Sequence, residues 1–78
     1  MSKIHVNPGQ DEMNGVISQI EADAAVDDLQ LTIAGTSTGQ IVIEGSKSEI
    51  ANLICSAAFR DRFFDGASIK EVKAKIVG

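Results

Sequence analysis

The stretch that decides the fold is LQLTIAGTSTGQIVIEG, residues 29–45. Apolar side chains occupy alternate positions on both sides of its centre: Leu29, Leu31 and Ile33, then Ile41 and Ile43. A period of two is typical of strands that bury one face. Between the two runs, the sequence Gly-Thr-Ser-Thr-Gly of residues 35–39 has the composition of a turn. The stretch therefore predicts a β-hairpin.

A helix is predicted on each side of this hairpin. Before it, apolar residues recur at spacings of three and four, at Met13, Val16, Ile17, Ile20 and Ala24. Asn7 and Pro8 supply a cap and a first-turn proline for that helix. After the hairpin, Ser46 and Glu49 match a capping box. The second helical stripe follows, at Ile50, Leu53, Ile54 and Ala57, and Asp65-Gly66 supplies its stop signal.

Short strands are predicted at both ends of the chain. Ile4 and Val6 alternate with polar residues near the N-terminus, and Val72, Ala74 and Ile76 do so near the C-terminus. The order is then βαββαβ in a single α+β domain, residues 1–78. This is the order of the ferredoxin-like split fold, an antiparallel sheet with two helices on one face. If the first strand does not pair, the alternative is αββαβ with a loose N-terminus.

Composition indicates the cellular compartment of the protein. The 78 residues include one cysteine, Cys55, so no internal disulfide can form, and this favours a reducing compartment. No apolar run approaches the roughly 20 residues that span a bilayer, and the residues before Pro8 are too few for a signal peptide. We therefore expect a soluble, cytoplasmic protein that does not bind membranes.

The sequence offers little material for catalysis. His5, the one histidine, lies in a predicted strand, and Cys55 lies in a predicted helix, where we interpret it as inert packing. A nucleophile needs a base within hydrogen-bond reach, and no His, Cys or carboxylate cluster has metal-ligand spacing. We therefore predict that the protein is not an enzyme and needs neither a metal nor a cofactor.

Three families that share the βαββαβ order can be excluded from specific residues. The predicted strands lack the aromatic side chains of RNA-recognition motifs, Cys55 has no partner for a metal-carrying loop, and residues 1–46 lack the arginine of acylphosphatases. In contrast, Val6-Asn7-Pro8-Gly9 is similar to the turn that opens the first helix of ligand-sensing ACT domains. This resemblance implies a sensor of amino acids or other small ligands.

Charge is distributed unevenly along the chain. Residues 1–46 hold one lysine against seven carboxylates, a net charge of −6, whereas residues 47–78 hold six basic against four acidic residues. Such an acidic segment repels phosphate backbones and attracts basic surfaces, so direct nucleic-acid binding is not expected. The candidate partner-binding residues in this half are Asp11, Glu12, Glu21, Asp23, Asp27 and Asp28.

The segment of residues 58–64, AFRDRFF, holds all three aromatic residues and is the alternative binding surface. An unbroken helix would place Phe59 and Phe63 outward, flanked by Arg60 and Arg62, which are residue types enriched at binding hot spots. A break near Phe59 would instead direct Phe63 and Phe64 into the core, and we favour that arrangement because a small domain needs its aromatic residues inside.

We therefore expect a protein-binding module, an acidic inhibitor or adaptor that docks on a basic, nucleic-acid-handling partner. By type, although by no shared motif, the chain is similar to small phage-encoded proteins that block host defences, including anti-CRISPR proteins. Two alternatives remain open. One is a self-associating domain, a homodimer that pairs through a sheet edge or through its phenylalanines. The other is the ACT-like sensor.

Overall fold

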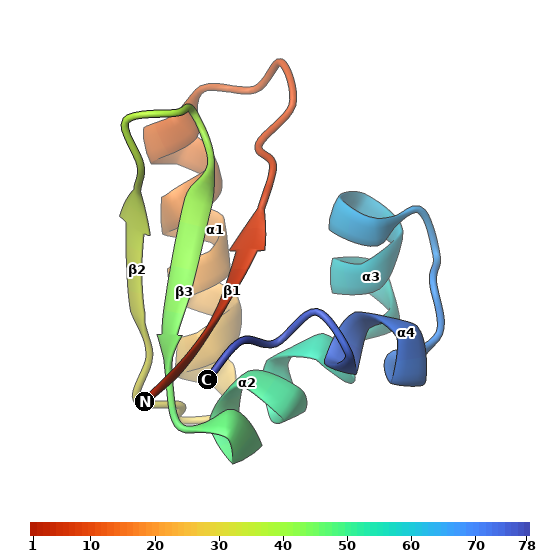
Figure 1. The fold of residues 1–78 in the computed structure, drawn as a ribbon. Helices are drawn as coiled ribbons and strands as arrows, with labels where there is room; N and C mark the ends of the chain where they lie inside the picture. The colour runs from red at the N-terminus through yellow and green to blue at the C-terminus, as the bar shows by residue number, and fades with distance from the viewer.

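The computed structural model describes residues 1–78 and contains three strands and four helices (Figure 1). In chain order they are β1 (Ser2–Val6), α1 (Met13–Val26), β2 (Thr32–Gly35), β3 (Ile41–Gly45), α2 (Lys47–Ile54), α3 (Ala57–Phe64) and α4 (Ile69–Lys73). The strands form one antiparallel sheet in the order β1-β3-β2. The α+β class and the hairpin are confirmed, but the observed order is βαββααα and not the βαββαβ order of the ferredoxin-like fold.

The first strand pairs along its whole length. β1 runs beside β3 from Ser2, opposite Gly45, to Val6, opposite Ile41. Its inward side chains are buried, whereas Lys3 and His5 face outward, as the alternation predicts. The alternative with a loose N-terminus is therefore wrong.

The predicted C-terminal strand is also wrong, because residues 69–73 form helix α4. Ser68 caps this helix, and its Oγ accepts a hydrogen bond from the Glu71 N–H at 3.2 Å. Val72 and Ile76 alternate as in a strand, but they are also four residues apart, which is helical spacing. Only Val77 keeps a strand contact, exchanging hydrogen bonds of 2.9 and 2.8 Å with Lys3.

Helix α1 begins later than its sequence signals predict. Asn7 does not cap it: the Asn7 side chain accepts a hydrogen bond from the Gly9 N–H at 3.0 Å and closes a local turn. The helix starts at Met13, after Glu12, which makes no side-chain cap. The turn at Asn7 therefore does not open the helix, and the strand order shared with ACT domains is not found.

The second predicted helix is divided into α2 and α3. The break lies at Cys55 and Ser56, a few residues before the predicted position, and the Ser56 Oγ caps α3 by accepting from the Phe59 N–H at 3.3 Å. The Phe59 side chain is buried, with ring centroids 4.8 Å from Phe63 and 6.1 Å from Phe64. The expected burial is confirmed for Phe59, whereas Phe63 and Phe64 pack against the core but remain half-buried.

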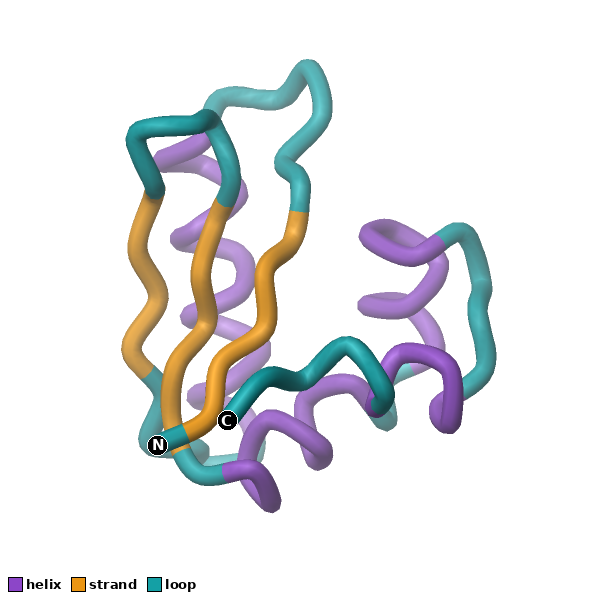
Figure 2. The backbone as a smooth tube through the Cα atoms, viewed as in Figure 1, coloured by secondary structure: helices purple, strands orange, loops and turns teal.

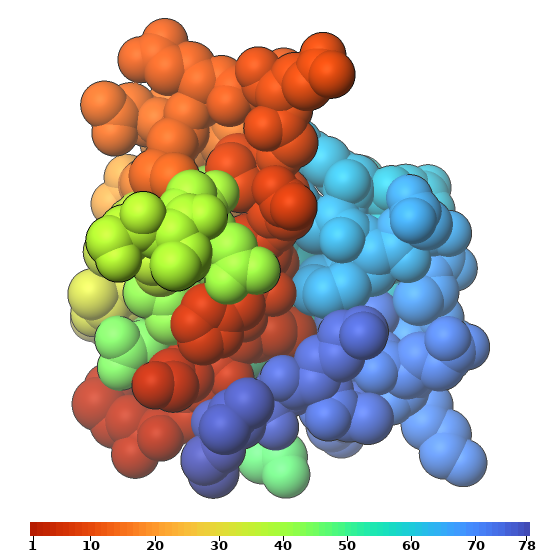
Figure 3. Space-filling model, turned by 45° about the horizontal axis from the view of Figure 1, so that its top comes forward, coloured from red at the N-terminus to blue at the C-terminus, as the bar shows by residue number.

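Helices cover one face of the sheet and leave the other open. In Figure 2, α1 lies behind the strands and α2, α3 and α4 gather beyond the β1 edge. The core between them includes side chains from both groups: Ile4, Val16, Ile20, Ile43, Ile50, Ile54, Phe59 and Val72. In the space-filling view, the C-terminal segment lies alongside β1 (Figure 3). Function must therefore be sought on the outer surface.

Candidate interaction surfaces

The structure contains no enclosed site. No pocket opens between the elements, and no three His, Cys, Asp or Glu side chains gather closely enough to hold a metal ion. None of the four helices combines the length and apolar character that crossing a membrane requires. The candidate sites are therefore patches of exposed side chains.

The two potential nucleophile or base residues lie apart. His5 is exposed on the open face of the sheet, opposite Val42. The sequence predicts that Cys55 is packed inside a helix. In the structure, Cys55 is exposed at the C-terminal end of α2. At about 100° per residue, Cys55 lies on the side of α2 away from the buried Ile50, Leu53 and Ile54, which explains its exposure.

The surface predicted around Phe59 and Phe63 does not form as an exposed patch. Phe59 lies in the core with 3% of its surface exposed, and Phe63 is half-buried against it. The Arg60 guanidinium donates hydrogen bonds to three carbonyl oxygens, those of Ile54 at 2.9 Å, Cys55 at 2.9 Å and Ala67 at 3.1 Å. Phe59 and Arg60 therefore hold the helices together instead of facing a partner.

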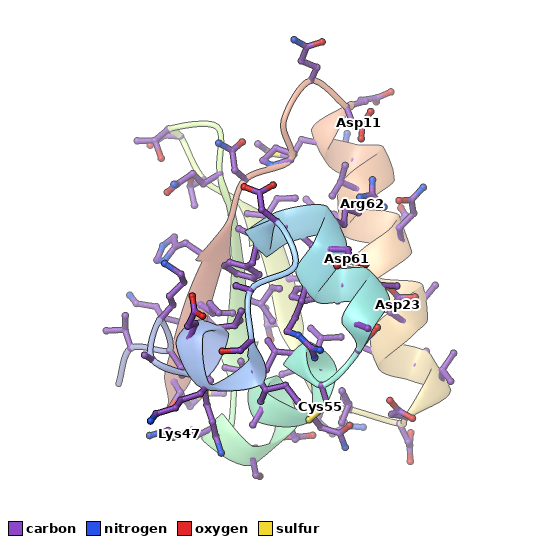
Figure 4. All side chains as sticks on the ribbon, turned by 90° about the vertical axis from the view of Figure 1, so that its right-hand side faces the viewer. Asp11, Asp23, Lys47, Cys55, Asp61 and Arg62 are labelled. Atoms are coloured by element: carbon purple, nitrogen blue, oxygen red, sulfur yellow. The ribbon has the colours of Figure 1, made fainter.

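Arg62 remains at the surface and lies between α3 and α1. Its guanidinium forms the one salt bridge of the protein, to Asp11 at 3.3 Å, also donates to Gln19, and lies 5.3 Å from the Phe63 ring centroid. Figure 4 shows Asp11, Arg62, Asp61 and Asp23 following one another along the side where α3 faces α1. Arg62 thus reduces the negative charge near the start of α1.

The six predicted acidic residues do not form one patch. Consecutive helical residues are rotated by about 100°, so Glu21 and Asp23 point to flanks of α1 that differ by about 200°. Asp11 and Asp27 lie near opposite ends of the helix, roughly 20 Å apart at 1.5 Å per residue. This separation exceeds the Debye length of about 8 Å at physiological salt, so the two ends act separately on a partner.

The C-terminal end of α1 carries three unpaired carboxylates. We call Asp23, Asp27 and Asp28 the acidic corner, and their carboxylates make no salt bridge or hydrogen bond. Asp23 and Asp27 are four residues apart, hence neighbours on the helix surface. The carbonyl end of the helix dipole adds further negative potential there.

An exposed apolar side chain lies within the acidic corner. Val26, three residues after Asp23, has 82% of its surface exposed, the second-highest exposure among the large apolar residues, after Met1. Sequence reasoning did not select Val26. Its position off the core stripe, directly before two aspartates, is the signal that could have identified it.

Local backbone geometry fixes the direction of the corner. Asp27 ends the helix and Asp28 follows with φ of 55°, in the left-handed region that glycine favours. The N–H groups of Asp28 and Leu29 then bond back to the carbonyls of Ala25 at 3.1 Å and Ala24 at 2.9 Å. This pair of bonds is a Schellman motif, which closes the helix and holds Asp27 and Asp28 at its tip.

Comparisons with protein-family models, with curated proteins and with solved structures found no match for this chain. The geometry of its surfaces is therefore the basis for proposing a function.

Proposed function

We propose that the protein is a non-catalytic protein-binding module, a small inhibitor or adaptor that docks its acidic corner on a basic surface of a partner. The observation that carries this proposal is that the corner combines three features that each oppose folding. Residues that are retained although they lower the stability of the fold are characteristic of functional sites.

The cost of the corner can be estimated feature by feature. Like charges four residues apart, at Asp23 and Asp27, cost roughly 0.2–0.5 kcal/mol. Acidic side chains at the carbonyl end of a helix cost about 0.3–1 kcal/mol. A residue other than glycine in the left-handed region, here Asp28, costs about 1 kcal/mol more. The total, about 2 kcal/mol, is large for a small domain, whose stability is roughly 0.05–0.15 kcal/mol per residue.

The chemistry of the corner defines the class of partner. Unpaired carboxylates at one tip favour lysine- and arginine-rich surfaces and speed the encounter with them. Val26 supplies an exposed apolar contact beside these carboxylates. A nucleic-acid-handling protein has such a basic surface, and occupying it would block its substrate. Phage-encoded anti-defence proteins, anti-CRISPR proteins among them, act in this manner, and we propose a role of that type in the cytoplasm.

Affinity capture from the lysate of the native host tests the proposal. The protein is immobilised beside two variants with equal changes in net charge, Asp23→Lys/Asp27→Lys in the corner and Glu12→Lys/Glu21→Lys away from it. Asp28 is left unchanged because lysine would add strain at its positive φ.

We expect the wild-type protein and the Glu12/Glu21 variant to retain the same basic partner, which high salt releases. The Asp23/Asp27 variant should retain little of it. Equal retention by the two variants would show that the acidic corner is not the binding surface, even if a partner is found.

Self-association is a second candidate function, and one observation favours it. Phe59 is buried, so association through the phenylalanines is not supported, but the edge of β2 is open.

A further inference from the structure

Strand β2 presents unpaired backbone groups at the edge of the sheet. Lys3 exchanges its backbone hydrogen bonds with Val77, on the far side of β1. Glu44, opposite Lys3 in β3, must then direct its own N–H and C=O towards Thr32 in β2. Alternation along β2 directs the N–H and C=O of Ile33 away from the sheet. The same alternation applies to Leu31 and Gly35.

Apart from the length of β2, which is only four residues, this edge lacks the devices that usually prevent strands from pairing. Natural edge strands carry lysine, proline or bulges that block another strand. Residues 29–43 contain neither a charged side chain nor a proline, although the protein has a net charge of −4. The pairing of β2 with β3 is also continuous, from Thr32 to Gly35.

The hydrophobic core is open on the same side. Every inward-facing residue of β1 and β3 is buried. In contrast, the inward side chains beside the β2 edge pack on the core but remain half-exposed: Met13, Ile17, Leu31 and Ile33. An added strand would therefore both satisfy the outward backbone groups and cover this aliphatic row.

We propose that a second copy of this chain pairs with the β2 edge, antiparallel about a two-fold axis at Ile33. The joined sheet would have six strands, with α1 of both copies on one face. In this register Ile33 meets Ile33, and Leu31 of each copy lies opposite Gly35 of the other, next to the Met13 side chain that covers Gly35. Three pairs of the hydrogen-bonded type supply about six backbone bonds.

Charge directs two copies to this edge and away from their other surfaces. Two chains of net charge −4 repel each other over most of their surfaces, and the uncharged edge is where they can meet. The acidic corner precedes the start of β2 in the chain. Because the two β2 strands run in opposite directions, the two corners lie at opposite ends of the joined sheet. This proposal does not depend on the proposed partner of the corner.

Sedimentation velocity over micromolar to millimolar concentrations tests the association. The test variant is Thr32→Lys/Ala34→Lys, because both side chains are exposed on the open face and Glu44 lies beside Thr32 to receive the new charge. The control is His5→Lys/Gln10→Lys, with the same number of lysines at exposed positions elsewhere.

We expect a monomer–dimer equilibrium for wild type and control. In the test variant, two lysine pairs lie directly opposite each other across the axis, which should raise the dissociation constant by roughly tenfold or more. A wild-type protein that remains monomeric, or a dimer equally stable in both variants, would overturn the proposal. Circular dichroism verifies that the variants fold.

Disulfide cross-linking tests the register independently. In a Cys55→Ser background, Thr32→Cys chains are mixed with Ala34→Cys chains and mildly oxidised. Thr32 of one copy lies opposite Ala34 of the other in a pair without hydrogen bonds, where Cα atoms are about 4.5 Å apart, a distance that a disulfide spans. We expect cross-linked dimers in the mixture and few in either chain alone. Equal cross-linking in all three samples contradicts the register.

The dependence on salt concentration distinguishes this association from docking of the acidic corner. Screening reduces repulsion between two acidic copies, so the dimer should be as stable or more stable at high salt. Capture of a basic partner should weaken under the same conditions. The Asp23→Lys/Asp27→Lys variant should still dimerise, so either proposal can fail while the other holds.

Discussion

Replacing Arg60 should destabilise the fold far more than replacing Arg62, although both arginines belong to the same short helix. The Arg60→Met change keeps the aliphatic stem but removes donors to the carbonyls of Ile54, Cys55 and Ala67. These bonds connect the end of α2 to the loop before α4, so they hold three helices in place.

The magnitude follows from the type of bond. A hydrogen bond to a charged group contributes about 1.5–3 kcal/mol when it is well shielded. Arg60 is half-buried and water can replace part of each bond, so we expect a total loss of about 2–4 kcal/mol for all three bonds. The Arg62→Met control removes an exposed salt bridge to Asp11 and should cost about 1 kcal/mol or less.

Urea unfolding followed by far-ultraviolet circular dichroism measures both losses, since the chain has no tryptophan or tyrosine for fluorescence. Arg60→Lys should recover only part of the stability, because one ammonium cannot reproduce a planar fork of donors. If the two methionine variants lost equal free energy of unfolding, Arg60 would not be the link between the helices.

Three further results are expected. Asp28→Gly should raise the free energy of unfolding by about 1 kcal/mol and the melting temperature by roughly 4–8 °C, because it relieves a φ of 55° and removes charge from the helix end. The same change at Asp23, inside the helix, should lower both quantities. Hydrogen bonds from the Gln30 N–H and from Ser46 hold the pKa of Glu49 below its ordinary value of 4.5, so this group stabilises the fold above that pH and the gain is lost as pH falls through the lower folded pKa. Urea unfolding of Glu49→Gln should therefore differ most from wild type near neutral pH and converge with it in acid, whereas a constant difference would mean that Glu49 acts by packing. Cys55 should react with a thiol reagent in the native state, one equivalent per chain, and reaction only after unfolding would contradict its exposure.

The sequence predicts an element correctly where its apolar residues follow only one period, either that of a strand or that of a helix. The alternation in residues 29–45 predicts the hairpin, although β2 begins only at Thr32, and the three-and-four spacing from Met13 to Ala24 predicts α1. At the C-terminus, Val72 and Ile76 satisfy both periods. The capping-box pattern of Ser68 and Glu71 decides between them in favour of a helix.

The candidate sites were harder to predict because they depend on how elements meet. The charge of Arg60 indicates an exposed residue, but the break at Ser56 brings the carbonyls of α2 within its reach. The acidic residues are close in sequence, yet helical rotation and the length of α1 separate Glu21 from Asp23 and Asp11 from Asp27. The position of Arg60 requires the relative positions of α2 and α3, whereas the separation of the acidic residues follows once the bounds of α1 are known.

The strand order has a consequence for how the sheet assembles. β2 and β3 are neighbours in sequence, whereas β1 joins β3 by pairing residues as far apart as Ser2 and Gly45. Closing the longer loop costs more chain entropy, so we expect the hairpin to form early and β1 to dock late. Until β1 docks, β3 also has an open edge, and its first three residues belong to the longest uncharged stretch of the chain, residues 29–43. Substitutions that delay the docking of β1 should therefore increase aggregation during refolding while leaving the final structure unchanged.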